Sequence, residues 1–180
     1  MDIVAIAVIA LLIALAAWFL LRRRSTQQLR SQFGPEYQRA IEESGGQREA
    51  ESRLHARAER VRQYHLQPLT PEDQQRYAAA WRRIQARFVD DPKGAADRAD
   101  ELLAQVMSAK GYPTDDYEQR LEDLSVDHAE AVQEYRSAHD VTERHARGDA
   151  STEDMRQAMI HYRVLFDELL GGSAPLKAAS

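Results

Sequence analysis

One stretch of the chain is apolar without interruption. From Ile3 to Leu21 it reads IVAIAVIALLIALAAWFLL and contains no charged residue, Gly, Pro, Asn or Gln. As a helix rising about 1.5 Å per residue it is about 28 Å long, close to the roughly 30 Å hydrocarbon core of a bilayer. A helix also satisfies its own backbone hydrogen bonds in lipid. The pattern predicts a transmembrane anchor over residues 1–24, with the span at about 3–21.

The charges that flank this stretch predict its orientation. Only Met1 and Asp2 precede it, whereas three arginines follow it at once. Cytoplasmic flanks are enriched in Arg and Lys, and Trp favours the membrane interface, where Trp18 would lie. The sequence therefore predicts a single-pass protein with its N-terminus outside and the rest of the chain cytoplasmic. The anchor residues are Ile3, Leu11, Leu12, Trp18, Leu21, Arg22, Arg23 and Arg24.

A cleaved signal peptide is the alternative for the same stretch. Ala14, Leu15 and Ala16 form an A-x-A-like site, and cleavage there would leave a chain that begins at Ala17. Signal peptides, however, carry their basic residues before the apolar segment, and here the basic residues come after it. The charge order favours a retained anchor, and an exported protein stays as the alternative.

Residues 25–69 are predicted to form a charged helical spacer. Gly34 and Pro35 break its first part, and Gly45 and Gly46 end the next. The segment from Gln47 to Leu66 is rich in Arg and Glu, and a coiled coil needs more sustained heptads than it contains. A solvated spacer is therefore favoured over a coiled-coil seam. Its narrow apolar stripe consists of Ala50, Leu54, Ala58, Val61 and His65.

Residues 70–172 carry repeated helix start and stop signals. Thr70 followed by Pro71 is typical of a capped helix start, and Asp91 before Pro92 repeats it. Ser151 and Asp154 resemble a capping box, and Ser125 or Asp127 is expected to open the preceding helix. We find no strand-like alternation. The sequence predicts an all-α chain in which a small multi-helix bundle follows the anchor and spacer, with a disordered tail at 173–180.

The apolar positions of this bundle recur at helical spacing. Tyr77, Trp81, Ile84 and Phe88 share one face of their helix, and the last helix has the most regular stripe in the chain. An aromatic stripe of this kind is far more often core than a ligand pocket. The predicted core residues are Trp81, Ile84, Phe88, Leu102, Val106, Tyr135, Met155, Met159, Tyr162, Phe166 and Leu169.

Charge and cysteine content exclude several functions. Beyond Arg24 the chain has 21 Lys and Arg against 28 Asp and Glu, a net charge of about −7. A chain of this charge has no general attraction for nucleic acid. The absence of Cys from the sequence excludes disulfides, thiolate zinc sites, iron–sulfur clusters and cysteine nucleophiles. Nucleotide-binding loops, zinc-protease and serine-hydrolase motifs are also missing, which predicts no cofactor and no enzyme.

The histidines offer the one candidate for chemistry. His139 lies on the inner face of its helix, Asp140 is beside it, and His161 lies on the last helix. Such residues could form a metal or pH-sensing site. The other interpretation, which we favour, is a core His139 bonded to a carboxylate or carbonyl, because no two histidines have the i, i+4 spacing of a ready ligand pair. No metal is therefore predicted.

Several runs of the sequence carry a family resemblance. They are WRRIQARFVDDPKGAADRADELLAQVM, then GYP, then LSVDHAEAVQEYR, and finally STEDMRQAMIHYRVLFDELL. Over about Leu29 to Leu170 the chain resembles a family of uncharacterised bacterial proteins described only as membrane or secreted hypothetical proteins. The resemblance implies a bacterial origin, and hence the inner membrane for the anchor, and it implies no activity.

These observations favour a binding protein over an enzyme. We expect a non-enzymatic adaptor or scaffold at the bacterial inner membrane, which contacts lipid through residues 3–21 and binds an unidentified protein partner. A homo-oligomer is compatible with the same pattern. The alternatives are a small-ligand or metal sensor around His139, and an exported protein with a cleaved signal.

Overall fold

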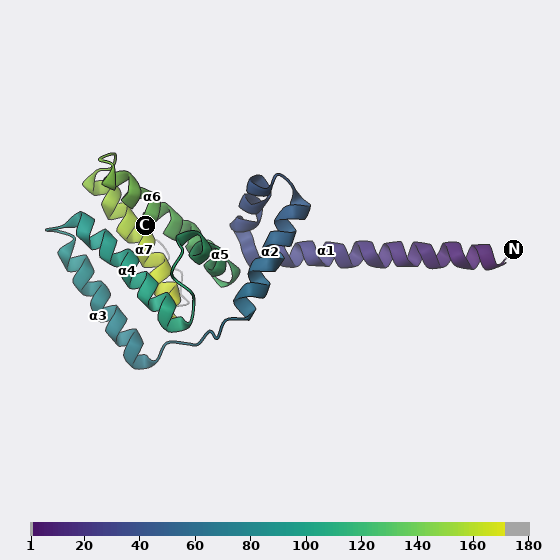
Figure 1. The fold of residues 1–180 in the computed structure, drawn as a ribbon, viewed down its shortest axis with the longest axis horizontal. Coiled ribbons are helices and arrows are strands. Elements are labelled where there is room, and N and C mark those ends of the chain that lie inside the picture. The colour runs from purple at the N-terminus through teal and green to yellow at the C-terminus, as the bar shows by residue number, and fades with distance from the viewer. Residues whose placement is uncertain (1, 172–180) are drawn as a thin grey trace, which may run out of the picture. The chain divides into compact units, whose positions relative to one another are not determined.

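The computed structural model describes residues 2–171, without the side chains of residues 2–10 and 21. Every regular element within this range is a helix, so the predicted all-α class is confirmed. The predicted tail at 173–180 lies outside the described residues. The helices are α1 (Asp2–Ser44), α2 (Gln47–Arg62), α3 (Pro71–Arg87), α4 (Pro92–Lys110), α5 (Tyr117–Asp127), α6 (Ala129–Ala146) and α7 (Thr152–Leu169), as labelled in Figure 1.

The chain divides into two compact units, Met1–Ala56 and Arg57–Ser180. The division falls inside α2, whereas the sequence pattern places the start of the bundle at Thr70. The last turns of α2 thus belong with the bundle and the first turns with α1.

In the first unit, α1 is helical up to Phe33 and changes direction at Gly34. Gly34 has φ +44° and ψ −121°, a conformation that breaks the helix and that glycine adopts without the strain of a side chain. Pro35 then takes the first turn of the helical segment that ends at Ser44. The predicted break at these two residues is confirmed.

The first unit has buried apolar residues of its own, among them Ala50 and Leu54 of the stripe that the sequence pattern indicates. Its α1 and α2 parts are joined by hydrogen bonds, since Thr26 and Tyr37 both donate to Glu51 Oε1, at 2.8 and 2.9 Å. Burial acts to raise the pKa of Glu51, but hydrogen bonds from Gln47, Thr26 and Tyr37 outweigh it, and the pKa lies below its ordinary value. The buried apolar residues are Leu29, Phe33, Tyr37, Ala40, Ala50 and Leu54.

The part of α1 between residues 11 and 20 is different, because its large apolar side chains are all exposed, by 52–64%. In the residues whose side chains are described, no helix is both long enough and apolar enough to cross a membrane. Ile3 and Leu21, which the sequence pattern assigns to the anchor, lie outside those side chains.

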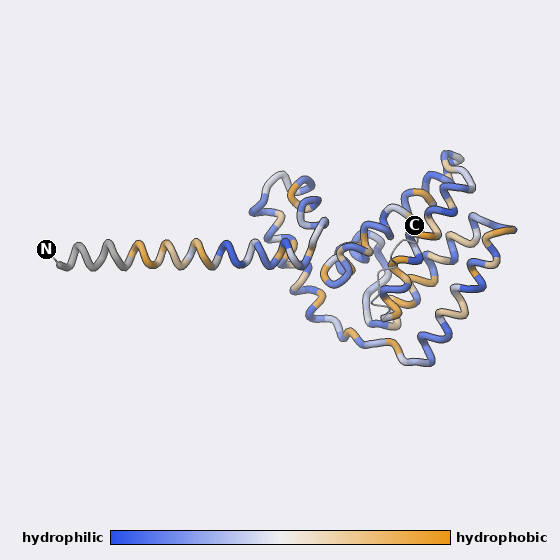
Figure 2. Tube along the Cα trace, turned by 180° about the vertical axis from the view of Figure 1, so that it is seen from behind, coloured by the Kyte–Doolittle hydropathy of each residue, from blue (hydrophilic) through white to orange (hydrophobic). Residues whose placement is uncertain are grey.

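In the second unit, five helices pack as neighbours in the order α3, α4, α7, α6, α5 (Figure 1). α3 packs on α4, α4 on α7, and α7 on both α4 and α6. Hydrophobic positions recur along each of these helices among hydrophilic ones, as Figure 2 shows. The unit is therefore the bundle that the amphipathic stripes predict, with α3 at one end of the array.

Most of the predicted helix ends are confirmed. The Thr70 and Asp91 side chains accept from the backbone N–H groups of Asp73 and Gly94, and Ser151 with Asp154 forms a complete capping box. The expected helix start at Ser125 or Asp127 is wrong. α5 continues to Asp127, with Ser125 buried inside it, and α6 begins directly after His128 without a side-chain cap.

Ten of the predicted core residues are buried, and Phe88 is the exception. α3 ends at Arg87, so Phe88 is the C-cap residue and lies half-exposed in the turn to α4. Tyr135, Met155 and Tyr162 have no exposed surface. The aromatic stripe is core as far as Ile84 and leaves the core where the helix stops.

A fully buried carboxylate, Asp123 of α5, holds the segment at the end of α2. Its Oδ1 accepts from Arg60 Nε at 2.8 Å and its Oδ2 accepts from the Tyr64 hydroxyl at 2.8 Å. Arg57 and Arg60 also pair with Glu122, at 2.9 and 2.8 Å. Burial acts to lower the pKa of Arg60, but the two carboxylates outweigh it and raise that pKa.

Candidate binding groove between α3 and α4

The histidine candidates from the sequence do not meet at one site. His139 stacks on Tyr117 with ring centroids 3.8 Å apart, and its Nε2 is 3.6 Å from Glu143 Oε1. Asp140 accepts from Arg144 at 3.2 Å, and His161 Nδ1 pairs with Glu134. Each candidate therefore has a partner of its own. In the described part of the chain, no three His, Cys, Asp or Glu residues are arranged to hold a metal ion.

A second polar cluster lies inside the bundle and was not expected from the sequence. The Tyr135 hydroxyl donates to Asp100 Oδ1 at 2.6 Å and accepts from Arg120 at 3.1 Å, which links α4, α5 and α6. Burial, reinforced by Asp100, raises the pKa of Tyr135 well above its ordinary value. A phenol of this kind stays protonated at neutral pH and serves as a structural donor, so this cluster stabilises the fold.

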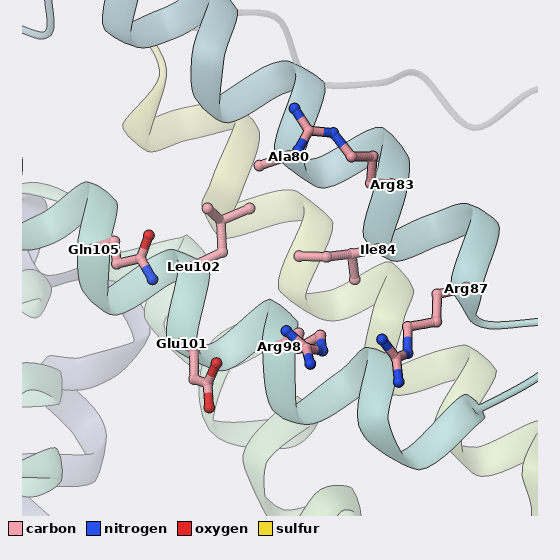
Figure 3. Close-up of a pocket in the computed structure, with 8 residues that line it drawn as sticks. All are labelled: Ala80, Arg83, Ile84, Arg87, Arg98, Glu101, Leu102 and Gln105. Carbon is pink, nitrogen blue, oxygen red and sulfur yellow. The ribbon is translucent and has the colours of Figure 1, made fainter.

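A groove with open space lies between α3 and α4. It has a volume of about 320 Å³ and is shallow. Figure 3 shows the side chains that line it, with Ile84 and Leu102 between the two helices. The lining residues are Ala80, Arg83, Ile84, Arg87, Arg98, Glu101, Leu102 and Gln105.

The helical repeat explains why these residues share one groove. On α3, Ala80, Arg83, Ile84 and Arg87 stand at i, i+3, i+4 and i+7, so they share one face of the helix. The lining residues of α4, from Arg98 to Gln105, have the same spacing, and they include Leu102 of its buried stripe. The floor of the groove is thus the seam where two apolar stripes meet, and its walls are the charged residues beside them.

The charges of the groove are largely uncompensated. Among the side chains that the structure describes, Arg83 and Arg98 make no hydrogen bond or ion pair with each other or with a neighbour. Arg87 makes a long contact with Asp91, at 3.3 Å. The hydrogen bond from the backbone N–H of Gly94 lowers the pKa of Asp91, and this effect is larger than the opposite effect of burial. The charges of Arg87 and Arg98 lower that pKa further. The groove therefore has two arginines on its α3 wall, and an arginine together with Glu101 on its α4 wall.

Two unpaired guanidinium groups beside an apolar floor are suited to binding a mixed ligand. A guanidinium binds carboxylates through two parallel hydrogen bonds, and Ile84 and Leu102 offer aliphatic surface next to it. The lining contains no His, Ser, Thr or Tyr, and its one carboxylate is that of Glu101.

The sequence predictions missed this groove. A local signal exists, because Arg83 has Ala79 and Ala80 before it and Ala86 and Arg87 after it at helical spacing. No acidic residue stands at i±3 or i±4 to pair with Arg83. Arg83 and Arg87, two like charges four residues apart beside a core stripe, are a signal of a binding surface. The position of Arg98 next to them depends on how α4 packs on α3, which the sequence of α3 does not specify.

Comparisons of the chain with protein-family models, with characterised proteins and with solved structures found no match. The features of the molecule that bear on function are therefore the groove and the exposed apolar part of α1.

Proposed function

We propose that this protein is a membrane-tethered helical adaptor, without enzymatic activity, that binds another protein through the α3–α4 groove. The observation that carries the proposal is the pair Arg83 and Arg98, which stand without partners among the described residues on either side of an apolar floor. Charged side chains of a monomeric bundle are usually solvated or paired along their own helix, as Arg144 and Arg163 are here.

The tether half of the proposal is supported by the exposed apolar residues of α1. Leu11, Leu12 and Ile13 are each at least 60% exposed in a helix that continues an apolar sequence from Ile3. Large contiguous apolar surface marks a place where a protein meets lipid or another protein. The length and the lack of charge between Ile3 and Leu21 favour lipid.

The arginines after this segment support the proposed membrane boundary. The guanidinium carbon of Arg22 lies 5.4 Å from the centre of the Trp18 ring, and that of Arg23 lies 5.5 Å from the Phe19 ring. Aromatic rings with cations beside them are typical of the interface between lipid tails and water. We place the inner-membrane surface at these residues, with the N-terminus outside and the bundle on the cytoplasmic side.

Photocrosslinking in living cells tests the groove. A photoreactive amino acid at position 105, in the groove lining, is compared with the same amino acid at position 133, on the exposed face of α6. We expect a discrete protein adduct in the membrane fraction from position 105 and not from position 133. An adduct with a second copy of this chain alone, or equal adducts from both positions, would contradict a partner-binding groove.

Fractionation and a C-terminal reporter test the tether. We expect the intact chain to stay in membranes after an alkaline wash, with a reporter fused after Ser180 active on the cytoplasmic side. N-terminal sequencing then separates the two interpretations of the apolar stretch. A released chain that begins near Ala17 would show a cleaved signal, and reporter activity on the outer side alone would reverse the orientation.

A further inference from the structure

The α3–α4 groove brings together two arginines that have no ion pair among the described side chains. Other arginines of the bundle have carboxylate partners: Arg57 and Arg60 bind Glu122, and Arg156 binds Glu153 at 2.6 Å. The exposed Arg82, outside the groove lining, has no such partner among the described side chains either. Arg83 and Arg98 come from different helices and have no such acceptor in the part of the chain that the structure describes. The groove thus has two guanidinium groups whose donors are open to the carboxylate of a ligand.

The composition of the groove distinguishes between classes of anion. Glu101 stands on the same wall as Arg98, three residues further along α4, and it would repel a ligand that is negative throughout. The chain as a whole carries a net charge of −5, which also opposes the approach of a polyanion. Nucleic acid and clustered phosphates are therefore poor fits, and a ligand with isolated negative charges suits the groove better.

The floor of the groove adds an apolar requirement. Ile84 and Leu102 are 8% and 5% exposed, so each offers a small patch of aliphatic surface at the bottom of the groove. A ligand side chain that covers this patch gains from burial of apolar area. Gln105 and Glu101 at one end can accept a hydrogen bond from an amide or a basic group.

From these features we propose that the groove binds a protein segment in which an Asp or Glu stands close to an aliphatic residue. The carboxylate lies between Arg83 and Arg98, and the aliphatic side chain lies on Ile84 and Leu102. This inference rests on the proposed function and deepens it by naming the chemistry of the partner. Phospholipid headgroups and RNA are the occupants that it excludes.

Peptide selection on the full-length protein tests the proposal. A display library of random 12-residue peptides is selected on the wild-type chain in detergent micelles, and the enriched peptides are measured by fluorescence anisotropy. We expect them to carry Asp or Glu near Leu, Ile, Val or Met. Affinity is expected to fall about 10- to 100-fold for Arg83→Glu/Arg98→Glu, because two attractive contacts become repulsive.

Arg82 provides the matched control, because it is an exposed arginine on the same helix, next to Arg83 and outside the groove lining. Arg82→Glu changes the net charge in the same direction, and we expect it to alter affinity less than threefold. A charge swap completes the test. A selected peptide whose acidic residue is replaced by Lys is expected to bind the Arg83→Glu/Arg98→Glu variant better than it binds the wild type.

Several outcomes would overturn the proposal. They are enriched peptides without acidic residues, an equal loss for Arg82→Glu, and a library that yields no binder dependent on Arg83 and Arg98. Stronger Arg83- and Arg98-dependent binding to phosphatidylglycerol vesicles or to a 20-nucleotide single-stranded RNA would also overturn it. The single variants Arg83→Gln and Arg98→Gln repeat the measurement if the double variant fails to show the helical circular dichroism of the wild type.

The crosslinking experiment keeps this inference separate from the proposed function. If position 105 captures a protein whose crosslinked segment has no acidic residue, the adaptor function stands and the partner chemistry is wrong. If position 105 captures no protein while acidic peptides still bind, the groove chemistry stands and the adaptor function is wrong.

Discussion

The two tryptophans of the chain show how one residue type can stand in opposite surroundings. Trp18 on α1 is 57% exposed, whereas Trp81 on α3 is 1% exposed and stacks on Phe166 with ring centroids 4.7 Å apart. Each ring has a guanidinium beside it, from Arg22 at 5.4 Å and from Arg163 at 5.7 Å. The cation is common to both sites, so the difference lies in what covers the rest of the ring.

This contrast extends to the segments around the two rings. The large apolar residues from 11 to 20 are all exposed, whereas most of those in α3 to α7 are buried against one another. Exposed apolar area costs roughly 25 cal/mol per Å² in water. The bundle removes this cost because its helices bury their apolar side chains against one another. The apolar side chains of the α1 segment remain exposed, so lipid or another protein would have to cover them to remove the same cost. If the bundle is stabilised by its own packing and the α1 segment by lipid, a substitution in one region should leave the other unaffected.

Trp81→Ala is expected to have the largest effect. Removing a buried Trp typically costs about 3–5 kcal/mol because it leaves a cavity and forfeits packing. We expect the free energy of unfolding of the bundle, measured with urea in detergent and followed by circular dichroism, to fall by about that amount.

Two matched variants sharpen this prediction. Trp81→Phe keeps the stack on Phe166 and removes an indole N–H that has no acceptor within the described residues, so its cost is expected to be below about 1.5 kcal/mol. Trp18→Ala is expected to leave unfolding of the bundle unchanged. Equal losses from Trp18→Ala and Trp81→Ala would remove the distinction between the two regions.

Leu12→Asp tests the α1 segment, because Leu12 stands at the midpoint of the apolar run from Ile3 to Leu21. An Asp at the centre of a membrane helix costs about 2.5–3.5 kcal/mol on insertion scales. We expect a smaller membrane-bound fraction of the protein and an unchanged unfolding curve for the bundle, measured by flotation and circular dichroism. An unchanged membrane fraction together with a destabilised bundle would show that this segment packs on protein.

Asp123→Ala tests a buried charge in the bundle. The substitution leaves the Tyr64 hydroxyl without its acceptor and removes one of the two carboxylates that bind Arg60. Because Glu122 remains, we expect a loss of about 1–3 kcal/mol in the free energy of unfolding. The exposed Asp115→Ala serves as the control, with an expected change within about 0.5 kcal/mol. Equal effects would mean that the buried position of Asp123 contributes nothing.

The smallest effect concerns pH and the start of α7. Hydrogen bonds from Arg156 and Gln157 lower the pKa of Glu153 from 4.5 to about 2. A pKa that is lower in the folded state stabilises the fold above pH 4.5, and this contribution is lost as the pH falls from 4.5 to about 2.

Glu153→Gln tests this pH dependence. We expect the wild type to melt slightly higher than the variant at pH 6, with the difference vanishing by about pH 2. A difference that stays constant from pH 6 to pH 2, measured by thermal unfolding, would contradict this account.

Local signals made the helices predictable from the sequence. The caps at Thr70, Asp91 and Ser151 depend on side chains within three residues of the backbone groups they bind, so spacing alone reveals them. The boundary between α5 and α6 was missed because Ser125 has the composition of a cap, yet its hydroxyl donates to the Glu122 carbonyl inside α5.

Tertiary features could not be read from the sequence. Phe88 follows the core spacing of Trp81 and Ile84, but the helix ends before it and the residue lies half-exposed. The sequence suggests His139, Asp140 and His161 as members of one site, but each interacts with a different neighbour in the structure. The groove depends on the approach of Arg98 on α4 to Arg83 on α3, which no periodicity along one helix specifies.

The unbroken course of α1 as far as Phe33 has a consequence for its length. From Arg22 to Phe33 the helix rises about 16 Å, and each residue turns it by about 100°. The number of residues between Arg24 and Leu29 therefore sets both the distance between these two residues along the helix and the angle between their side chains around its axis. One residue inserted between Arg24 and Leu29 would turn Arg22 by about 100° relative to the buried Leu29 and Phe33, whereas four inserted residues would almost restore the phase.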